Sequence, residues 1–552
     1  MSRLLDALTL EDALPRGRDW ASLRAGFRWP QPSRLNLAEA LVGLRAEAEP
    51  DRLALRHLDA AGRATDWSFR ALDRAACRLA NGLAAHGVGR GDRVAVLLGQ
   101  SPETLITHLA TYRLGAVIVP LFTPFGEEAL AFRLGDSAAA ALVTDRANLP
   151  KIVAIRDRLP DLRLVLCADG PVEGAESLPD FLARGRDAHA CAATSPDDPA
   201  LIAYTSGTTG PPKGALHGHR VLLGHLPAAR LAHDFAPRPG EVFWTPSDWA
   251  WMGGLCNLLM PALAWGAPVL SHRMEKFDPE RAFRVMADHH VASAFLAPTA
   301  LRLMRGAPAA ARAGARLRTV GAAGESLGAE LLDWGREALG LTIAEFYGQT
   351  ECNKVLTNAP ALFAPKPGST GRPAPGADVA VIDSAGRPLP AGETGEIAVR
   401  RGHPSMFLGY WRRPDRTAEK FVGDWMRTGD EGRADGEGHF FFSSRADDVI
   451  TSSGYRIGPS EIEDCLGGHP AVAMAAAVGL PDPLRGEIVA AFVVLRPGVE
   501  PAAALGDALA AHVRSRLGAH VAPRRVSFVD ALPLTATGKI MRREIRRAAL
   551  AQ

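Results

Sequence analysis

The sequence has 552 residues, too many for one hydrophobic core, and this length predicts about three or more packed units. Apolar residues make up 47% and charged residues 22%, so large-scale disorder is not expected. Basic residues (63) nearly balance acidic residues (61), and the net charge of +2 argues against a general nucleic-acid or membrane-surface binder.

The cysteines and the N-terminal residues indicate in which cellular compartment the protein is expected. Six cysteines with no CxxC pair are too sparse for a disulfide scaffold, which predicts a cytoplasmic protein. The N-terminus contains no apolar core long enough for a signal peptide. Residues 249–271 carry no charge, yet they include five Gly or Pro residues, so we expect buried core and no membrane span.

Short apolar runs alternate with helical patterns through the first 350 residues. Residues 94–98 are expected to form a buried strand, and Ser101, Pro102 and Glu103 then give a helix start with an N-cap hydroxyl. Further strands are expected at 117–121, 141–144, 164–167, 201–204, 294–296 and 317–320. Strands separated by helix-length segments predict an α/β fold of parallel βαβ units with helices on both faces of each sheet.

The pattern changes after about residue 370. Short strands at 379–382, 395–399 and 439–442, separated by Gly-rich turns, predict a small antiparallel or barrel-like subdomain. A polar stretch follows, and beyond it lies an α+β unit with strands near 473–478 and 489–495. Its helix near 502–517 should present one apolar face, made of Leu505, Leu509, Val513 and Leu517. We therefore expect a large domain over residues 1–445 and a small one over residues 446–552.

The most informative stretch is residues 204–214, which follows a predicted strand. It combines hydroxyl groups, three glycines and a lysine, so backbone N–H groups, hydroxyls and an ammonium can cradle a phosphate. The Walker A spacing is absent. The cradle residues are Thr205, Ser206, Gly207, Thr208, Thr209, Gly210 and Lys213.

This stretch resembles the phosphate-binding signature of the adenylate-forming superfamily, which includes acyl-CoA synthetases, adenylation domains and luciferases. Other segments resemble the family's further motifs in the expected order, across roughly residues 35–550. They are residues 321–325 (the adenine segment), 346–351 (aromatic-x-x-Thr-Glu), 428–430 (the ribose motif), 445–448 with 454–457 (hinge and crossover), and 533–539 (the C-terminal lysine motif). The likeness is greatest to short- and medium-chain acyl-CoA synthetases, whose small C-terminal domain is mobile.

The resemblance implies roles for individual residues. Lys539, Thr350 and Glu351 would carry catalysis, with Glu351 as a hard carboxylate ligand for Mg²⁺. Tyr347 would stack on adenine and Asp430 would accept hydrogen bonds from ribose. Further nucleotide-binding positions are Gly324, Glu325, Phe346, Gln349, Arg445 and Arg456.

The same resemblance implies a second half-reaction with coenzyme A. The C-terminal domain would rotate about Asp447, and Gly454 would line the tunnel for the thiol. Arg514 lies 25 residues before Lys539, a spacing that resembles a CoA-contacting arginine in acetyl-CoA synthetases.

A tryptophan-containing segment resembles the acyl-binding segment of short- and medium-chain relatives. By this resemblance Trp251, Met252 and Ala323 line the acyl pocket. Acetate-specific relatives have Trp where this chain has Gly348, so the glycine is expected to remove the pocket floor and admit acids beyond two carbons. Each added buried methylene contributes about 0.8 kcal/mol.

The function expected from the resemblance is ATP-dependent ligation of a short- or medium-chain carboxylic acid to coenzyme A through an acyl-adenylate. An aryl- or cyclic-acid CoA ligase, a stand-alone adenylation enzyme that loads a carrier protein, and a non-catalytic nucleotide-binding protein are the alternatives. The expected partners are the acid, ATP, Mg²⁺ and CoA, and no nucleic acid or membrane span. Acetylation of Lys539 by a lysine acetyltransferase, reversed by a deacetylase, would remove and restore its charge. The preferred acid, the oligomeric state and the role of His217 stay open.

Overall fold

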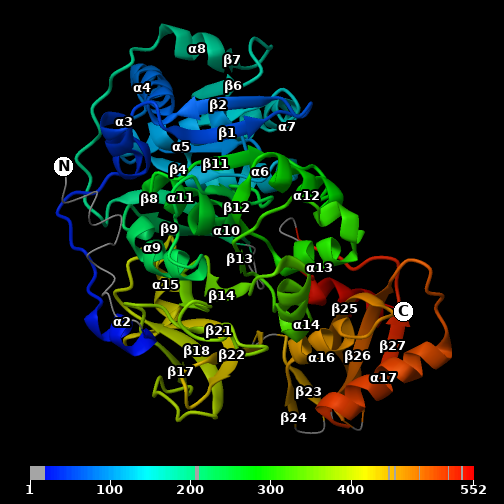
Figure 1. Cartoon of the computed structure of the whole chain (residues 1–552). Helices are drawn as coiled ribbons and strands as arrows, with labels where there is room; N and C mark the ends of the chain where they lie inside the picture. The colour runs from blue at the N-terminus through cyan, green and yellow to red at the C-terminus, as the bar shows by residue number, and fades with distance from the viewer. Residues whose placement is uncertain are drawn as a thin grey trace.

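The computed structural model of the chain describes residues 19–205, 211–445, 448–452, 455–483, 485–519, 521–535 and 539–551. Within these ranges the chain forms four β-sheets, together with the helices that cover them (Figure 1). The expected α/β class, with a smaller antiparallel part and a C-terminal α+β part, is confirmed. The expected boundary at residues 445/446 stays a prediction, since residues 446–447 lie outside the described ranges.

The first large sheet has the strand order β19-β9-β8-β4-β3-β5-β6-β7. Pairing is parallel from β8 to β7 and antiparallel at the β8–β9 and β9–β19 pairs. Its strands are β3 (Arg93–Leu97), β4 (Val117–Pro120), β5 (Ala139–Thr144), β6 (Leu164–Cys167), β7 (Glu176–Ser177), β8 (Pro199–Thr205), β9 (Lys213–Gly218) and β19 (Gly409–Tyr410). The helices of this part are α4 (Phe69–Ala85), α5 (Pro102–Arg113), α6 (Glu127–Ser137), α7 (Leu149–Ala154) and α8 (Leu178–Arg184).

The start of α5 shows how local chemistry sets an element boundary. The Ser101 hydroxyl accepts a hydrogen bond from the Thr104 backbone N–H at 3.2 Å, and Pro102 occupies the first helical turn. An N-cap hydroxyl satisfies one of the free N–H groups at a helix start, and proline has none to satisfy. The predicted helix start is confirmed.

The second large sheet has the order β16-β15-β14-β13-β12-β10-β11-β1-β2. It is parallel from β14 to β1 and antiparallel at both edges. Its strands are β1 (Leu53–Leu58), β2 (Ala64–Ser68), β10 (Val242–Trp244), β11 (Val269–His272), β12 (Val291–Phe295), β13 (Thr319–Ala322), β14 (Ala344–Gln349), β15 (Asn353–Thr357) and β16 (Arg372–Pro373). The helices of this part are α3 (Leu44–Ala48), α9 (Val221–Ala232), α10 (Met252–Gly254), α11 (Met260–Ala264), α12 (Pro279–Asp288), α13 (Pro298–Gly306) and α14 (Gly328–Trp334).

The uncharged segment 249–271 is core, as expected. It contains α10, α11 and β11, and Trp249 and Leu263 are almost fully buried. In the ranges that the structure describes, no helix combines the length and the apolar character needed to span a bilayer.

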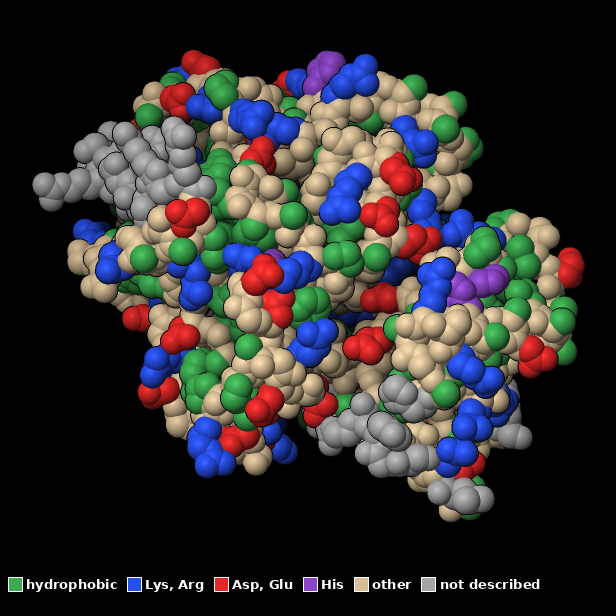
Figure 2. Space-filling view, turned by 60° about the horizontal axis from the view of Figure 1, so that its bottom comes forward, with side chains coloured by type: hydrophobic (Ala, Val, Ile, Leu, Met, Phe, Trp, Pro, Cys, Tyr) green, Lys and Arg blue, Asp and Glu red, His purple; other side chains and the backbone are tan. Residues whose placement is uncertain are grey.

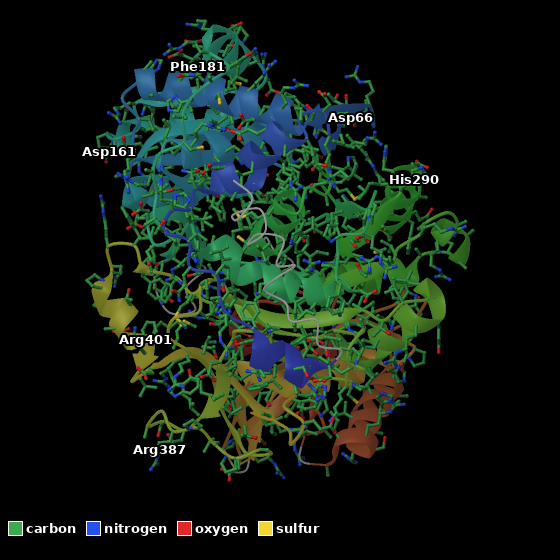
Figure 3. The ribbon with its side chains drawn as sticks, turned by 60° about the vertical axis from the view of Figure 1, so that its left-hand side comes forward. Asp66, Asp161, Phe181, His290, Arg387 and Arg401 are labelled. Carbon is green, nitrogen blue, oxygen red and sulfur yellow. The ribbon has the colours of Figure 1, made fainter. Side chains whose placement is uncertain are left out.

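A small antiparallel sheet follows, with the order β17-β18-β21-β20 and with β22 on β21, as the Gly-rich turns predicted. Its elements are β17 (Val379–Ile382), β18 (Thr394–Arg400), α15 (Pro414–Glu419), β20 (Phe421–Val422), β21 (Trp425–Ala434) and β22 (Phe440–Arg445). Helix α2 (Trp20–Gly26) lies beside this sheet in Figures 1 and 3, where Arg387 and Arg401 mark the sheet. Arg24 donates to the carbonyl of Ala377, and Trp29 donates to that of Gly376, each at 3.0 Å.

The C-terminal unit has a sheet of order β24-β23-β26-β25, with β27 parallel to β26. Its elements are β23 (Ile450–Ser452), β24 (Tyr455–Ile457), α16 (Pro459–Gly467), β25 (Val472–Asp482), β26 (Gly486–Leu495), α17 (Ala503–Leu517), β27 (Arg525–Phe528) and α18 (Arg542–Leu550). In α17, Leu509 and Val513 are fully buried and Leu505 packs beside them, but Leu517 is 36% exposed, so its assignment to the apolar face was wrong. An α-helix has about 3.6 residues per turn, so residues four apart do not lie directly above one another. Two steps of four residues from Leu509 therefore place Leu517 away from the buried face.

On the face drawn in Figure 2, basic and acidic side chains are interspersed, and no broad patch of one sign is visible. This mixing matches the nearly equal numbers of basic and acidic residues.

Candidate active site

Strands β8 and β9 frame the predicted phosphate loop. Thr205 ends β8, Lys213 begins β9, and the two residues are paired in register. The Thr205 hydroxyl donates to the Lys213 carbonyl at 3.3 Å, which ties the two ends of the loop together. The predicted cradle residues between them, Ser206, Gly207, Thr208, Thr209 and Gly210, lie outside the described ranges.

Tyr410 contacts two of the predicted site residues, Glu351 and Lys213. Its hydroxyl donates to Oε1 of the buried Glu351 at 2.5 Å, and the Lys213 ammonium lies 4.8 Å from its ring centroid. Burial raises the pKa of Tyr410, and the carboxylate of Glu351 raises it further. Burial lowers the pKa of Lys213, while Glu351 acts in the opposite direction. Tyr410 is on β19, which pairs with β9, and sequence reasoning did not single it out.

The donor set around Glu351 suits a magnesium ion that is held chiefly by phosphates. No cluster of three or more His, Cys, Asp or Glu ligands occurs in the part of the chain that the structure describes. Mg²⁺ in nucleotide sites usually keeps several waters and takes one or two carboxylates together with substrate phosphates. A single buried carboxylate fits that pattern.

A second cluster gathers the predicted adenine and ribose residues. The Tyr347 hydroxyl and the Gln349 amide each donate to the same oxygen of Asp430 at 2.6 Å. Gln349 also donates to the Thr428 carbonyl at 2.9 Å, and Asp430 is 4% exposed. Burial and the Asp430 carboxylate both raise the pKa of Tyr347. The two residues expected to contact adenine and ribose are thus hydrogen-bonded to each other.

Asp430 is paired in register with Arg445 across β21 and β22, so the ribose and hinge motifs are neighbours on one pair of strands. Arg456 belongs to β24. The side chains of Arg445 and Arg456 are not among those described, and Asp447 and Gly454 lie outside the described ranges.

Lys539 reaches the large domain at Gly324. A Cβ atom built on Gly324 would lie 3.4 Å from the Trp251 ring and 3.6 Å from Cε of Lys539, and its φ of +102° is one that glycine adopts readily. The Lys539 segment is closed on itself, because Thr535 and Lys539 exchange hydrogen bonds of 2.8 and 3.1 Å. The structure therefore brings together Trp251, Gly324 and Lys539, which come from three distant predicted motifs.

Glu325 contacts its own domain. It accepts hydrogen bonds from the Thr299 hydroxyl at 2.7 and 2.8 Å and from Arg302 at 2.9 Å. The next residue, Ser326, donates at 2.5 Å to Asp464 on α16 of the C-terminal unit. Burial raises the pKa of Asp464 to about 6. This contact joins the segment before α14 to α16, which lie side by side in Figure 1.

The predicted acyl-pocket residues separate into two groups. Met252 and Ala323 are buried, and the Trp251 ring packs 5.7 Å from that of Phe295. At Gly348, the structure gives a different reason for the absence of a side chain. A Cβ atom on it would lie 1.5 Å from the carbonyl oxygen of Asn353, so the backbone of β15 occupies the direction in which a side chain would extend. The inference that Gly348 leaves an open pocket floor therefore gains no support from this geometry.

Arg514, the predicted CoA contact, is exposed on α17. Thr350 lies in the turn between β14 and β15. His217 is fully buried on β9, and burial lowers its pKa to about 4, so this imidazole is neutral at physiological pH.

Sequence reasoning also missed Lys354, Phe295 and Asp464. Lys354 is one of seven lysines and follows Glu351 by three residues, but a sequence position carries no sign of burial. A possible signal was its place in an apolar strand, where a charged residue is unusual.

Comparison with known proteins connects this geometry to a family. Residues 44–411 match the family model described as "AMP-binding enzyme", and residues 461–539 match "AMP-binding enzyme C-terminal domain". The chain is 34% identical to the acetyl-coenzyme A synthetase of Bacillus subtilis, over 96% of this chain and 93% of that protein. It is 35% identical to the human mitochondrial acyl-coenzyme A synthetase ACSM2B, over 96% of this chain and 93% of that protein.

Solved structures agree with this similarity. The anthranilate CoA ligase AuaEII in complex with anthranoyl-AMP matches with a TM-score of 0.86 and 27% identity, covering 94% of this chain and 99% of that one. The acyl-CoA synthetase of Brucella canis matches with a TM-score of 0.74 and 35% identity, covering 98% of this chain and 99% of that one.

Proposed function

The chain belongs to the AMP-binding enzyme family, and from that premise we propose which residues carry its reaction and which acids it takes. It is an enzyme, an AMP-forming acyl-CoA synthetase. It ligates a carboxylic acid to coenzyme A at the expense of ATP, through an acyl-adenylate.

In the first half-reaction the acid's carboxylate attacks the α-phosphate of ATP and pyrophosphate leaves. Two anions must approach each other, so fixed positive charge is the largest contribution that the protein can make. We assign this role to Lys539. The observation that carries the assignment is the approach of its side chain to Gly324 of the predicted adenine segment, the residue beside which the Trp251 ring also lies.

Glu351 would hold Mg²⁺, which supplies charge neutralisation for the leaving pyrophosphate when bound. Tyr410 keeps one oxygen of that carboxylate oriented, and Lys213 lies over the face of the Tyr410 ring as a second cation. Asp430, with Tyr347 and Gln349 bonded to one of its oxygens, would receive the ribose hydroxyls. The cradle residues 206–210 would hold the phosphates.

In the second half-reaction the CoA thiol attacks the acyl-adenylate and expels AMP. We propose that the C-terminal domain turns about Asp447 between the two steps, withdrawing Lys539, and that Gly454 and Arg514 serve the CoA path. The exposed position of Arg514 on α17 is compatible with contact to a large soluble substrate.

The acid that we propose is larger than acetate. Trp251, Phe295 and Phe346 form a row of rings with centroids 5.7 and 5.5 Å apart. Phe295 and Phe346 are buried and Trp251 is partly exposed, so the surroundings of Trp251 are apolar and favour an aliphatic chain. An aryl acid is the second candidate, because aromatic rings also stack on aromatic rings.

We also propose a cytoplasmic location and regulation by acetylation of Lys539. The six cysteines, all within the described ranges, are free thiols, which supports a reducing compartment. Removal of the Lys539 charge would block adenylation, since the same charge is needed to bring the two anions together.

The deciding experiment measures pyrophosphate release and thioester formation over a panel of acetate, butyrate, hexanoate, octanoate and benzoate, with and without CoA. We expect pyrophosphate release that depends on the acid and turnover that requires CoA. A protein that turns over only when a carrier protein replaces CoA would contradict the assignment.

A further inference from the structure

Lys354 is a buried lysine without a partner. It lies on β15, is 2% exposed, and its Nζ makes no hydrogen bond within the described part of the chain. The Nζ atom lies over the face of Phe346, 3.5 Å from the ring centroid. Lysine is almost never fully buried unless it is paired, and an unsatisfied buried polar group calls for an explanation.

Among the residues that the structure describes, no carboxylate contributes to the pKa shift of Lys354. His225 and His233 are its titratable neighbours, and both are fully buried with pKa values lowered first by burial, so both are neutral. The pKa of Lys354 itself is lowered well below its ordinary value by burial. Removing a charge from water costs several kcal/mol, and a nearby opposite charge is the usual compensation. No described residue provides an opposite charge to this lysine.

A row of aromatic rings connects Lys354 with the reaction centre. The row begins at Trp251, whose ring lies beside Gly324, the residue that the Lys539 side chain also approaches. It continues to Phe295 and Phe346, and the face of Phe346 carries the ammonium of Lys354. One lysine thus stands at each end of an apolar row: Lys539 at the reacting end and Lys354 at the far end.

We propose that Lys354 selects the substrate, and that the acid is a dicarboxylic acid whose second carboxylate pairs with this ammonium. The reacting carboxylate would meet Lys539, the methylene chain would lie along the rings, and the far carboxylate would supply the missing anion. An N⁺–H···O⁻ hydrogen bond in a water-poor site is among the strong ones. A monocarboxylic acid of the same length leaves Lys354 buried and unpaired, so it binds less well.

This inference rests on the proposed function and names the substrate class of the same site. Its experiment compares matched pairs of acids on the full-length protein: glutarate with pentanoate, adipate with hexanoate, and suberate with octanoate. The measured quantity is kcat/KM for formation of the mono-CoA thioester, with pyrophosphate release as a second readout. Three proteins are compared: wild type, Lys354→Met and the control Lys276→Met, which removes an exposed lysine in a bend.

For wild type and Lys276→Met we expect at least one diacid to exceed its matched monoacid by roughly 10- to 100-fold, the range of a hydrogen bond to a charged group. In Lys354→Met, whose side chain is apolar and of similar length, the preference should reverse in favour of the monoacid. Lys354→Arg keeps the positive charge and should keep the diacid preference.

Each outcome separates this inference from the proposed function. If wild type prefers the monoacids, or if Lys354→Met leaves the ratio unchanged, Lys354 does not select the acid and the CoA ligase stands. If wild type forms no thioester with any acid, both are overturned. Thermal stabilisation of Lys354→Met by ATP tests whether this variant is folded. If it is not folded, the ratio of kcat/KM for diacid to kcat/KM for monoacid in the wild-type protein still decides the inference.

Discussion

Ser326 and Asp464 join the large domain to the C-terminal unit through a hydrogen bond of 2.5 Å between the serine hydroxyl and the carboxyl group. Arg302 lies 4.0 Å from the other oxygen of the same carboxyl, and Asp464 is nonetheless buried enough for its pKa to rise. The contact is therefore sensitive to the protonation of one group.

Replacement of Asp464 by Asn should remove a pH dependence of stability. The pKa of Asp464 is raised from 3.8 to about 6 in the folded protein, so between these values the folded chain binds a proton that the unfolded chain has lost. The contribution of Asp464 to the free energy of unfolding is therefore largest below pH 3.8 and decreases as the pH rises from 3.8 to about 6. Asp464→Asn should therefore gain unfolding free energy over wild type as pH rises, by about 3 kcal/mol at most.

Thermal denaturation between about pH 4 and pH 7 measures this gap. Asp333→Asn, an exposed aspartate on α14, is the control, and its curve should follow that of wild type. Parallel curves for wild type and Asp464→Asn would show that the carboxyl does not titrate in this window.

Lys539→Ala should abolish the first half-reaction and spare the second. We expect adenylation to fall by at least about 100-fold, as when one fixed electrostatic donor is lost from a transition state. Thioester formation from supplied acyl-AMP should fall much less. Lys276→Ala serves as the exposed control, and an equal loss of both half-reactions in a folded variant would take Lys539 out of its assigned role.

Tyr410→Phe should weaken the binding of Mg²⁺ during adenylation, although the Glu351 carboxylate is still present. The ring stays beneath Lys213, but Glu351 loses its hydroxyl partner. A hydrogen bond to a charged group is worth about 1.5–3 kcal/mol, so the rate at limiting Mg²⁺ should fall by roughly 10- to 100-fold and recover in part at high Mg²⁺.

A Mg²⁺ titration of the adenylation rate measures this effect. Tyr112→Phe removes another buried hydroxyl, one bonded to His108, and should leave the titration midpoint unchanged. An unaltered midpoint in Tyr410→Phe would exclude Tyr410 from positioning Glu351.

Gly348→Ala should destabilise the fold. The added methyl would overlap the Asn353 carbonyl oxygen, which is backbone and cannot rotate away, so the expected loss is about 3 kcal/mol or more. At Gly306, an added Cβ atom would meet no other part of the protein within 4 Å. Gly306→Ala should therefore change the unfolding free energy by no more than about 0.5 kcal/mol. Denaturant unfolding compares the two, and a Gly348→Ala protein as stable as wild type would refute the proposed close contact.

Local patterns predicted the fold well because they depend on near neighbours. The alternation of strands and helices, the Ser101 cap and the antiparallel texture after residue 370 all appear in the structure. The motifs also predicted segments that come together, such as those of Trp251, Gly324 and Lys539.

Contacts between segments that are far apart in the chain could not be predicted from the sequence. Tyr410 reaches Glu351 only because the short β19 pairs with β9, and nothing in the residues around 410 indicates that pairing. The burial of Lys354 likewise depends on how β15 packs against α9 and β14. Gly348 was interpreted from a family likeness as an opening, whereas register places the Asn353 carbonyl against it.

The docking of α2 has a consequence for synthesis of the protein. Arg24 donates to the carbonyl of Ala377, 353 residues further along the chain. At about 5–20 residues per second, a ribosome needs roughly 20–70 s to produce that partner after Arg24 has been made. During most of this interval Trp20, which is buried in the finished protein and packs edge-on against Phe363, lacks that ring as well. Helix α2, the first described helix of the chain, therefore cannot make these contacts until residues 363–377 have been synthesised.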